Sequence, residues 1–176
     1  MIDDSIVRGT TLQKSILKML DSLGPKKIVI VSSAPQIRYP DCYGIDMARL
    51  EEFIAFKAAL ALHREQETYN NVINSIYQKC VASFDSREDT PPNHVKEIYA
   101  PFTDDLISKK IGQILKSEGI KAEVEVLFQK IGDLHKACPK NLGDWYFSGD
   151  YPTLGGHRVV NRAFMNFYEG KSVRAY

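Results

Sequence analysis

The chain has 176 residues, of which 44% are hydrophobic and 26% are charged, a composition typical of one soluble globular domain with a sizeable core. Its formal net charge of +1 gives no reason to expect nucleic acid or an acidic membrane surface as a partner. The longest apolar run, around Ile28 to Val31, is far too short to span a membrane.

Residues 1–11 have the pattern of a short strand, a tight loop and the start of a helix. Two apolar residues precede the paired carboxylates Asp3 and Asp4, and a turn of hydroxyl, β-branched and glycine residues follows. A helix start presents unpaired backbone N–H groups and the positive end of the helix dipole, which suits a phosphate group. Gly9 would let the backbone approach the anion closely, and Thr10 and Thr11 would add hydroxyl donors and cap the helix.

The paired carboxylates predict a second ligand group beside the phosphate. Asp3 and Asp4 repel phosphate, but they accept hydrogen bonds from sugar hydroxyls and can bind a hard cation such as Mg²⁺. A phosphate at one end of the loop and a diol or metal at the other describe a ribose 5-phosphate. The residues alone leave open an ordinary capped helix after an acidic turn.

The next two elements complete a βαβ unit. Residues 11–23 are amphipathic at helical spacing and end at Gly24, with an apolar stripe of Leu12, Ile16, Met19, Leu20 and Leu23. The β-branched run 28–31 then indicates a buried strand, which a right-handed connection should place parallel to the first. The loop 5–11 would therefore lie at the carboxyl end of its strand, where open α/β sheets bind ligands. Ser33 follows the second strand and could face the same pocket, the alternative being a turn-forming serine within the loop 32–46.

The rest of the chain alternates helices and one strand. Residues 47–85 are predicted to be helical almost throughout, in two amphipathic segments, and a polar, proline-bearing break follows at 86–93. Thr103 is the expected N-cap of a further helix that stops at Gly119. Residues 121–129 alternate apolar and charged side chains, which predicts a strand of the kind found at sheet edges, and a short helix should follow at 131–137.

Two stretches carry a resemblance to a known family. IDDSIVRGTT, residues 2–11, looks like the phosphoribosyl pyrophosphate (PRPP) loop of type I phosphoribosyltransferases, and in full it is similar to the amidophosphoribosyltransferase family. SSAPQIRYPDCYGIDM, residues 32–47, resembles the same family at the expected distance downstream. The resemblance implies an α/β fold, in which the chain forms the second half of a type I phosphoribosyltransferase parallel-sheet domain.

The resemblance also implies a substrate, a metal and a reaction. Enzymes of this family are glycosyltransferases that make 5-phosphoribosylamine from PRPP and glutamine in the first committed step of purine synthesis. The implied PRPP-binding residues are Asp3, Asp4, Ser5, Ile6, Val7, Arg8, Gly9, Thr10 and Thr11. The two aspartates would hold the ribose hydroxyls, directly and through Mg²⁺, and the others would grip the 5-phosphate of PRPP or of a purine nucleotide. No catalytic residue is assigned within this chain, because positioning and electrostatics would be its contribution.

The same resemblance suggests how the chain is divided. Residues 1–137 match the second half of the transferase domain, ending in the last strand and helix of VEVLFQKIGDLHKA. Residues from about 62 to 102 look like a helical insertion relative to the compact bacterial enzymes. Residues 138–176 form an aromatic C-terminal extension in which 158–168 should be helical.

The iron–sulfur branch of the family carries ligand cysteines just before a segment like Tyr151-Pro152-Thr153. The matching stretch here, GDWYFSGDYPT, contains no cysteine, so we expect no iron–sulfur cluster. We expect packing of four aromatic side chains in its place: Trp145, Tyr146, Phe147 and Tyr151.

The remaining cysteines and histidines are not assigned any chemistry. The three cysteines, Cys42, Cys80 and Cys138, are widely spaced, which predicts free thiols in a reducing cytoplasm. The four histidines show no metal-ligand spacing, and we expect them at the surface or at helix ends: His63, His94, His135 and His157.

Members of this family also carry a glutaminase domain, the earlier strands of the transferase domain, a pyrophosphate loop and a loop that closes over PRPP. We therefore expect this chain to be part of a larger, homo-oligomeric enzyme and to be inactive alone. Two alternatives stay open. One is a PRPP- or nucleotide-binding regulatory module without transfer, and the other is a scaffold fragment whose helices and aromatic tail form a subunit interface.

Overall fold

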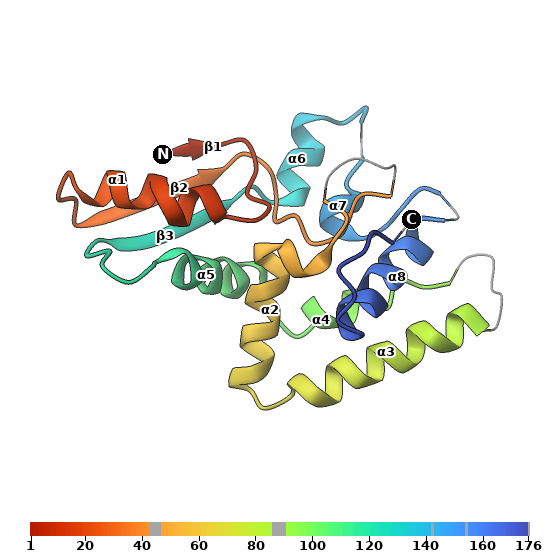
Figure 1. Cartoon of the computed structure of the whole chain (residues 1–176). Coiled ribbons are helices and arrows are strands. Elements are labelled where there is room, and N and C mark those ends of the chain that lie inside the picture. The colour runs from red at the N-terminus through yellow and green to blue at the C-terminus, as the bar shows by residue number, and fades with distance from the viewer. Residues whose placement is uncertain (43–46, 86–90, 142, 154, 176) are drawn as a thin grey trace.

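A three-stranded parallel sheet forms one end of the molecule in a computed structural model that describes residues 1–42, 47–85, 91–141, 143–153 and 155–175 (Figure 1). The strands lie in the order β1 (Ile2–Asp3), β2 (Lys27–Ser32) and β3 (Glu123–Phe128). Helices surround the sheet and extend away from it, so the α/β class is confirmed and is consistent with part of a type I phosphoribosyltransferase fold. All three predicted strands are present.

The βαβ unit predicted from the first 31 residues is also confirmed, because β1 and β2 pair in parallel. Between them lie a π-helical turn, η1 (Leu12–Ile16), and a short helix, α1 (Leu17–Asp21). The predicted apolar stripe is only partly correct. Leu12 and Leu17 are buried, whereas Met19 and Leu23 are exposed, because the π-helical turn rotates the residues that follow it relative to a regular helix.

A long crossover joins β2 to β3. Its helices are η2 (Leu50–Glu52), α2 (Ile54–Glu65), α3 (Tyr69–Asp85), α4 (Lys96–Tyr99) and α5 (Asp104–Leu115). The predicted N-cap is confirmed, since the Thr103 hydroxyl accepts a hydrogen bond from the Leu106 N–H at 3.2 Å. That helix ends at Leu115, short of the predicted stop at Gly119. Residues 43–46 of the predicted loop and 86–90 of the predicted break lie outside the described residues.

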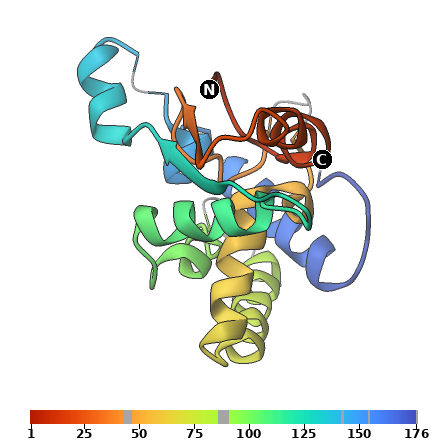
Figure 2. The same ribbon diagram turned by 90° about the vertical axis from the view of Figure 1, so that its left-hand side faces the viewer.

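The inner face of the sheet packs on α5, and α5 packs on α2. Ile30 and Val126 of the sheet are buried together with Ile107 and Ile111 of α5. Viewed along the strands, α5 lies beneath β3 and α6 projects beyond the end of that strand (Figure 2). Gly112 permits the close approach of helix and strand, because a Cβ at this position would lie 3.0 Å from the carbonyl oxygen of Val124.

The outer face of the sheet is open. Ile2, Val31 and Leu127 lie side by side across the three strands and are 79%, 37% and 46% exposed. Parallel sheets are ordinarily covered on both faces. Here α1 and the β2-to-β3 crossover leave this apolar row uncovered.

The C-terminal part contains α6 (Ile131–Ala137), α7 (Trp145–Ser148) and α8 (Gly156–Tyr168). Aromatic side chains pack there as predicted. The Tyr146 hydroxyl donates to Asp41 at 2.7 Å, and the buried Tyr151 hydroxyl donates to the carbonyl of Pro40. At the end of the molecule away from the sheet, α8 packs along α3 (Figure 1). The ring of Phe167 in α8 meets the ring of Phe56 in α2 edge-on. The proposed insertion at 62–102 and the boundary at residue 137 stay predictions.

His63 is one of the histidines expected at the surface or at a helix end, and it lies at a helix end. It occupies the last turn of α2, but its side chain is buried, with Nε2 2.9 Å from the Ile98 carbonyl and Nδ1 2.9 Å from the Thr68 hydroxyl. Two hydrogen-bond partners satisfy the ring in the core.

Among the helices of the described residues, none combines the length and the apolar character needed to cross a membrane.

Candidate functional site

The loop after β1 lines a hollow of about 390 Å³. Eight of the nine predicted PRPP-binding residues lie on its wall, beside three neighbouring apolar residues: Asp3, Ser5, Ile6, Val7, Arg8, Gly9, Thr10 and Thr11, with Met1, Leu12 and Ile16. Asp4 is the exception. The structure therefore gathers the predicted site at the carboxyl end of β1, where a βαβ unit presents its loop.

The end of β1 is fixed by the residue that follows β2. The Ser33 N–H donates to the Asp3 carbonyl at 2.9 Å, and the Ser33 hydroxyl donates to the Asp4 carbonyl at 3.1 Å. Ser33 does not line the hollow, which differs from its predicted place in the ligand pocket. Its hydroxyl instead holds the backbone that carries the two carboxylates.

The two carboxylates differ in environment. Asp3 is half-buried on the wall of the hollow, and burial raises the pKa of its carboxyl, as does the neighbouring Asp4. Asp4 is exposed, and one of its oxygens accepts the Ser5 N–H at 2.9 Å. Two adjacent carboxylates form an oxygen donor set that suits sugar hydroxyls or a hard divalent cation. The residues present thus fit Mg²⁺.

Packing against the hydrophobic core requires a glycine at position 9. Its φ of +70° lies in the left-handed region that favours glycine. A Cβ added there would lie 2.6 Å from Ile54 Cδ1 and 2.7 Å from Leu115 Cδ2, both of which are buried. The missing Cβ therefore points into the interior. We expected Gly9 to let the backbone approach the phosphate closely, but the space that a Cβ would fill is occupied by Ile54 of α2 and Leu115 of α5.

The backbone of the loop is tied to two helices. The Val7 carbonyl accepts the Ile54 N–H at 2.8 Å, and the Gly9 carbonyl accepts the Gln13 N–H at 2.9 Å. The second bond begins the helical hydrogen-bond pattern. In the described part of the chain, no protein acceptor is found for the backbone N–H groups of Thr10, Thr11 and Leu12.

Thr10 and Thr11 are exposed at this helix start. Thr11 makes no side-chain capping bond, so its predicted capping role is not observed and its hydroxyl stays available to a ligand. Exposed hydroxyls and unpaired N–H groups at the positive end of a helix dipole form an anion-binding arrangement.

Arg8 is held by a carboxylate that sequence reasoning missed. Its Nε donates to Glu52 Oε2 at 2.7 Å, and Arg49 bonds the other oxygen of the same carboxylate. Arg49 also donates to the Ser172 hydroxyl at 2.9 Å, which links the loop to the C-terminal segment. Arg8 and Glu52 are 44 positions apart, and no local spacing signals their pairing.

No model of a known protein family matches the chain, and no solved structure matches it. An amidophosphoribosyltransferase of Haemophilus influenzae is 55% identical over 56 residues, which are 32% of this chain and 11% of that protein. The amidophosphoribosyltransferase of Pyrococcus horikoshii is 47% identical over 55 residues, 31% of this chain and 12% of that protein.

The amidophosphoribosyltransferase of Saccharomyces cerevisiae extends the similarity, with 31% identity over 134 residues. That match covers 72% of this chain and 26% of the yeast protein. The chain thus spans between about a tenth and a quarter of the length of these relatives. Relatives of the same name from bacteria, yeast and an archaeon agree with the family suggested by residues 2–11 and 32–47. The chain is homologous to the amidophosphoribosyltransferases.

Proposed function

We propose that the chain supplies the PRPP-binding part of an amidophosphoribosyltransferase. The observation that carries the proposal is the single hollow at the end of β1, which gathers Asp3 and the loop 5–11 beside unpaired helix N–H groups. Homology to proteins named amidophosphoribosyltransferase supports a phosphoribosyl substrate. In the proposed reaction, ammonia from glutamine displaces pyrophosphate from C1 of PRPP.

Each part of the loop has a role in this reaction. The N–H groups of Thr10, Thr11 and Leu12, with the threonine hydroxyls, bind the 5-phosphate. Asp3 and Asp4 accept hydrogen bonds from the ribose hydroxyls and would also hold Mg²⁺, whose positive charge would stabilise the pyrophosphate leaving group. The chain contributes orientation and electrostatic stabilisation to an oxocarbenium-like transition state. These roles leave the nucleophile, ammonia, to be delivered from outside the loop.

The test replaces Asp3 and Asp4 together by Asn in the complete polypeptide that carries this segment. Asn keeps the size of Asp but removes the charge that attracts Mg²⁺ and strengthens the bonds to hydroxyls. Each lost charge-assisted bond should cost about 1.5–3 kcal/mol, so PRPP-dependent activity should fall roughly ten- to a hundred-fold per bond. The rate is measured at limiting PRPP and Mg²⁺.

Asp133→Asn is the matched control, because Asp133 is an exposed carboxylate on α6 paired only with Lys136. It should leave the rate unchanged. Binding of inorganic phosphate should survive the double aspartate change, since the loop 5–11 is intact. Full activity of the double variant at limiting PRPP and Mg²⁺ would refute the assignment.

A further inference from the structure

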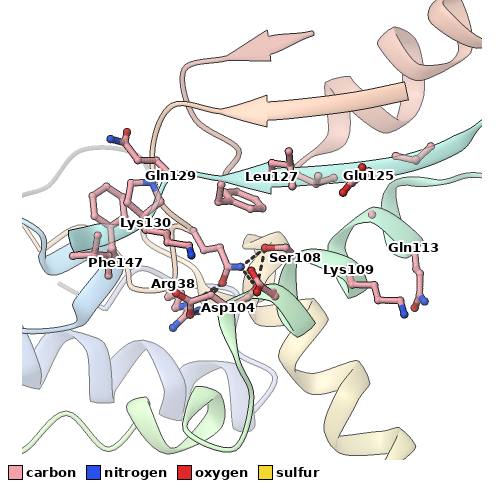
Figure 3. A pocket seen from close by; sticks show the side chains of 18 of the residues that line it. Arg38, Asp104, Ser108, Lys109, Gln113, Glu125, Leu127, Gln129, Lys130 and Phe147 are labelled. Carbon is pink, nitrogen blue, oxygen red and sulfur yellow. Dashed lines mark hydrogen bonds and ion pairs between the residues drawn. The ribbon is translucent and has the colours of Figure 1, made fainter. Parts of the chain in front are cut away.

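A groove of about 850 Å³ lies between β3 and α5 and contains an arginine that offers a comparison for Arg8 of the PRPP loop. In this groove Arg38 donates to the Gln36 side-chain oxygen and pairs with the Asp104 carboxylate, whose side chain is 64% exposed (Figure 3). Among the described residues, four basic and four acidic side chains line the groove, so its charge is balanced. An ion pair with so exposed a carboxylate ordinarily contributes little to stability.

Glu52 holds Arg8 from a more buried and more rigid position. It is the last residue of η2, between Leu50 and Phe53, which are both fully buried, and its own side chain is 19% exposed. Its Oε2 lies 2.7 Å from Nε and 2.7 Å from Nη2 of Arg8. Charge-assisted contacts from two nitrogens of one guanidinium define the direction of the arginine as well as its position.

The other oxygen of the same carboxylate is also occupied. Arg49 bonds Oε1 of Glu52, and Arg49 donates as well to the Ser172 hydroxyl at 2.9 Å. Rotation of the carboxylate about its last bond would break its contacts with both arginines. Its orientation is therefore fixed from two sides.

Three successive residues of the PRPP loop rest on the turn 52–54. The Val7 carbonyl accepts the Ile54 N–H at 2.8 Å. The carboxylate at the start of the turn holds Arg8, and Ile54 fills the space beside the Cα of Gly9. The N–H groups of the proposed phosphate site follow directly in the chain. Their position therefore depends on these three contacts.

We propose that Glu52 is a positioning residue for the 5-phosphate of PRPP and that it acts through Arg8, an inference that rests on the proposed function. Among the described residues, Glu52 is not part of the wall of the hollow, so it would not touch the ligand. It holds Arg8 and the loop in one conformation before the substrate arrives, so that less conformational entropy is lost on binding. The phosphate is remote from C1, where pyrophosphate departs. The loss of Glu52 should therefore change KM more than kcat.

The test replaces Glu52 by Gln in the complete polypeptide that carries this segment, with PRPP varied at saturating glutamine and Mg²⁺. Gln keeps the size of the side chain but removes the charge that binds both arginines. The KM for PRPP should rise about ten-fold, and kcat should stay within about two-fold of the unmodified value. Glu51→Gln is the matched control, because Glu51 lies on the same turn and has no partner among the described residues. It should leave both constants unchanged.

A double-mutant cycle tests whether Glu52 acts through Arg8. Arg8→Met keeps most of the side-chain stem and removes the guanidinium, so the KM for PRPP should rise at least about ten-fold. Adding Glu52→Gln to Arg8→Met should raise KM by less than about two-fold more, because the contact between the two side chains is already lost. A further rise of about ten-fold would show that Glu52 acts by another route and would overturn the proposal.

A merely structural role for Glu52 would have a different signature. It would lower the melting temperature and the fraction of active protein, so kcat would fall while the KM for PRPP stayed unchanged. Glu52→Asp keeps the charge on a side chain one methylene shorter, and its KM should lie within about three-fold of the unmodified value. A rise as large as that of Glu52→Gln would exclude the charge as the cause. An unchanged KM in Glu52→Gln or in Arg8→Met would overturn the proposal, as would equal changes in Glu52→Gln and Glu51→Gln.

Binding of ribose 5-phosphate, measured by isothermal titration calorimetry, separates this inference from the proposed function. The unmodified polypeptide should bind ribose 5-phosphate, and Glu52→Gln should bind it about ten-fold more weakly. If the unmodified polypeptide bound none, the proposed function would fail and the inference with it. If both proteins bound it equally, the inference alone would fail.

Discussion

Gly9 shows how one position can serve the fold and the site together. The residue closes the phosphate loop with a φ of +70°, and the side of its Cα where a Cβ would stand faces Ile54 and Leu115. A single glycine thus lets the loop lie directly on α2 and α5. The shape of the proposed phosphate site depends on the core beneath it.

Gly9→Ala should therefore destabilise the whole chain. The added methyl group meets two buried side chains and takes up a left-handed conformation, and overpacking of this kind typically costs about 1–3 kcal/mol. Chemical denaturation measures the change in the free energy of unfolding. Gly132→Ala is the control, because a Cβ at Gly132 of α6 meets no atom within 4 Å. An unchanged midpoint for Gly9→Ala would show that the loop does not rest on the core in this way.

Residue-level chemistry was only partly predictable from the sequence. The composition of the loop 5–11 and its place after a strand are local properties, and they identified the hollow. The pairing of Arg8 with Glu52 and the packing of Gly9 on Leu115 join distant parts of the chain. No periodicity encodes such contacts. The burial of the helix-end residue His63 was not predicted for the same reason, because its partner is the distant backbone carbonyl of Ile98.

At the scale of elements, a carboxylate joins the end of α1 to the residues just before β3, 100 positions further along the chain. Asp21 Oδ1 accepts the N–H of Lys121 at 3.0 Å and of Ala122 at 2.8 Å, just before β3. The bond from the Ala122 N–H is the main reason that the pKa of Asp21 lies below its usual 3.8. The charged form is thus favoured in the folded state.

A carboxyl whose pKa is lowered by folding stabilises the protein above its unfolded pKa, and this stabilisation is lost as the pH falls through the folded value. Asp21→Asn should therefore lower the melting temperature at pH 7. The difference from the unmodified chain should shrink as the pH falls below about 4. Thermal unfolding at several pH values measures it, with Glu118→Gln, a change at an exposed carboxylate, as the control. A difference that persisted unchanged into strong acid would exclude the charge of Asp21 as its source.

The start of α5 offers a second test at this scale. Thr103 caps the helix through its hydroxyl, whereas Thr11 at the start of η1 makes no such bond. Thr103→Ala should lower the free energy of unfolding by about 1 kcal/mol. Thr11→Ala should leave it nearly unchanged, as urea denaturation would show. Equal losses in the two variants would mean that the cap is not what holds α5.

Elements defined by local patterns were predicted well. The run 28–31 became β2, the alternation at 121–129 became β3, and α6 matches its predicted range of 131–137. Helix lengths were less predictable, because tertiary packing decides them. The π-helical turn η1 shortened the first helix and exposed Met19, and α5 ended before Gly119.

At the scale of the whole molecule, the PRPP loop, the helical crossover and the C-terminal segment are linked. Glu52 bonds both Arg8 of the loop and Arg49, and Arg49 bonds Ser172 near the C-terminus. Two surfaces lie apart from this network: the open row Ile2, Val31 and Leu127, and the groove between β3 and α5.

The central claim is that the loop 5–11 recognises the phosphate of a ribose 5-phosphate group. The most direct measurement is a nuclear magnetic resonance titration of the ¹⁵N-labelled chain with ribose 5-phosphate in the presence of Mg²⁺. Saturable shifts are predicted for the amides of Gly9, Thr10 and Thr11, with the β3–α5 groove unaffected and with no shifts when ribose replaces ribose 5-phosphate. If these three amides showed no saturable shift, or shifted equally with ribose, the claim would be contradicted.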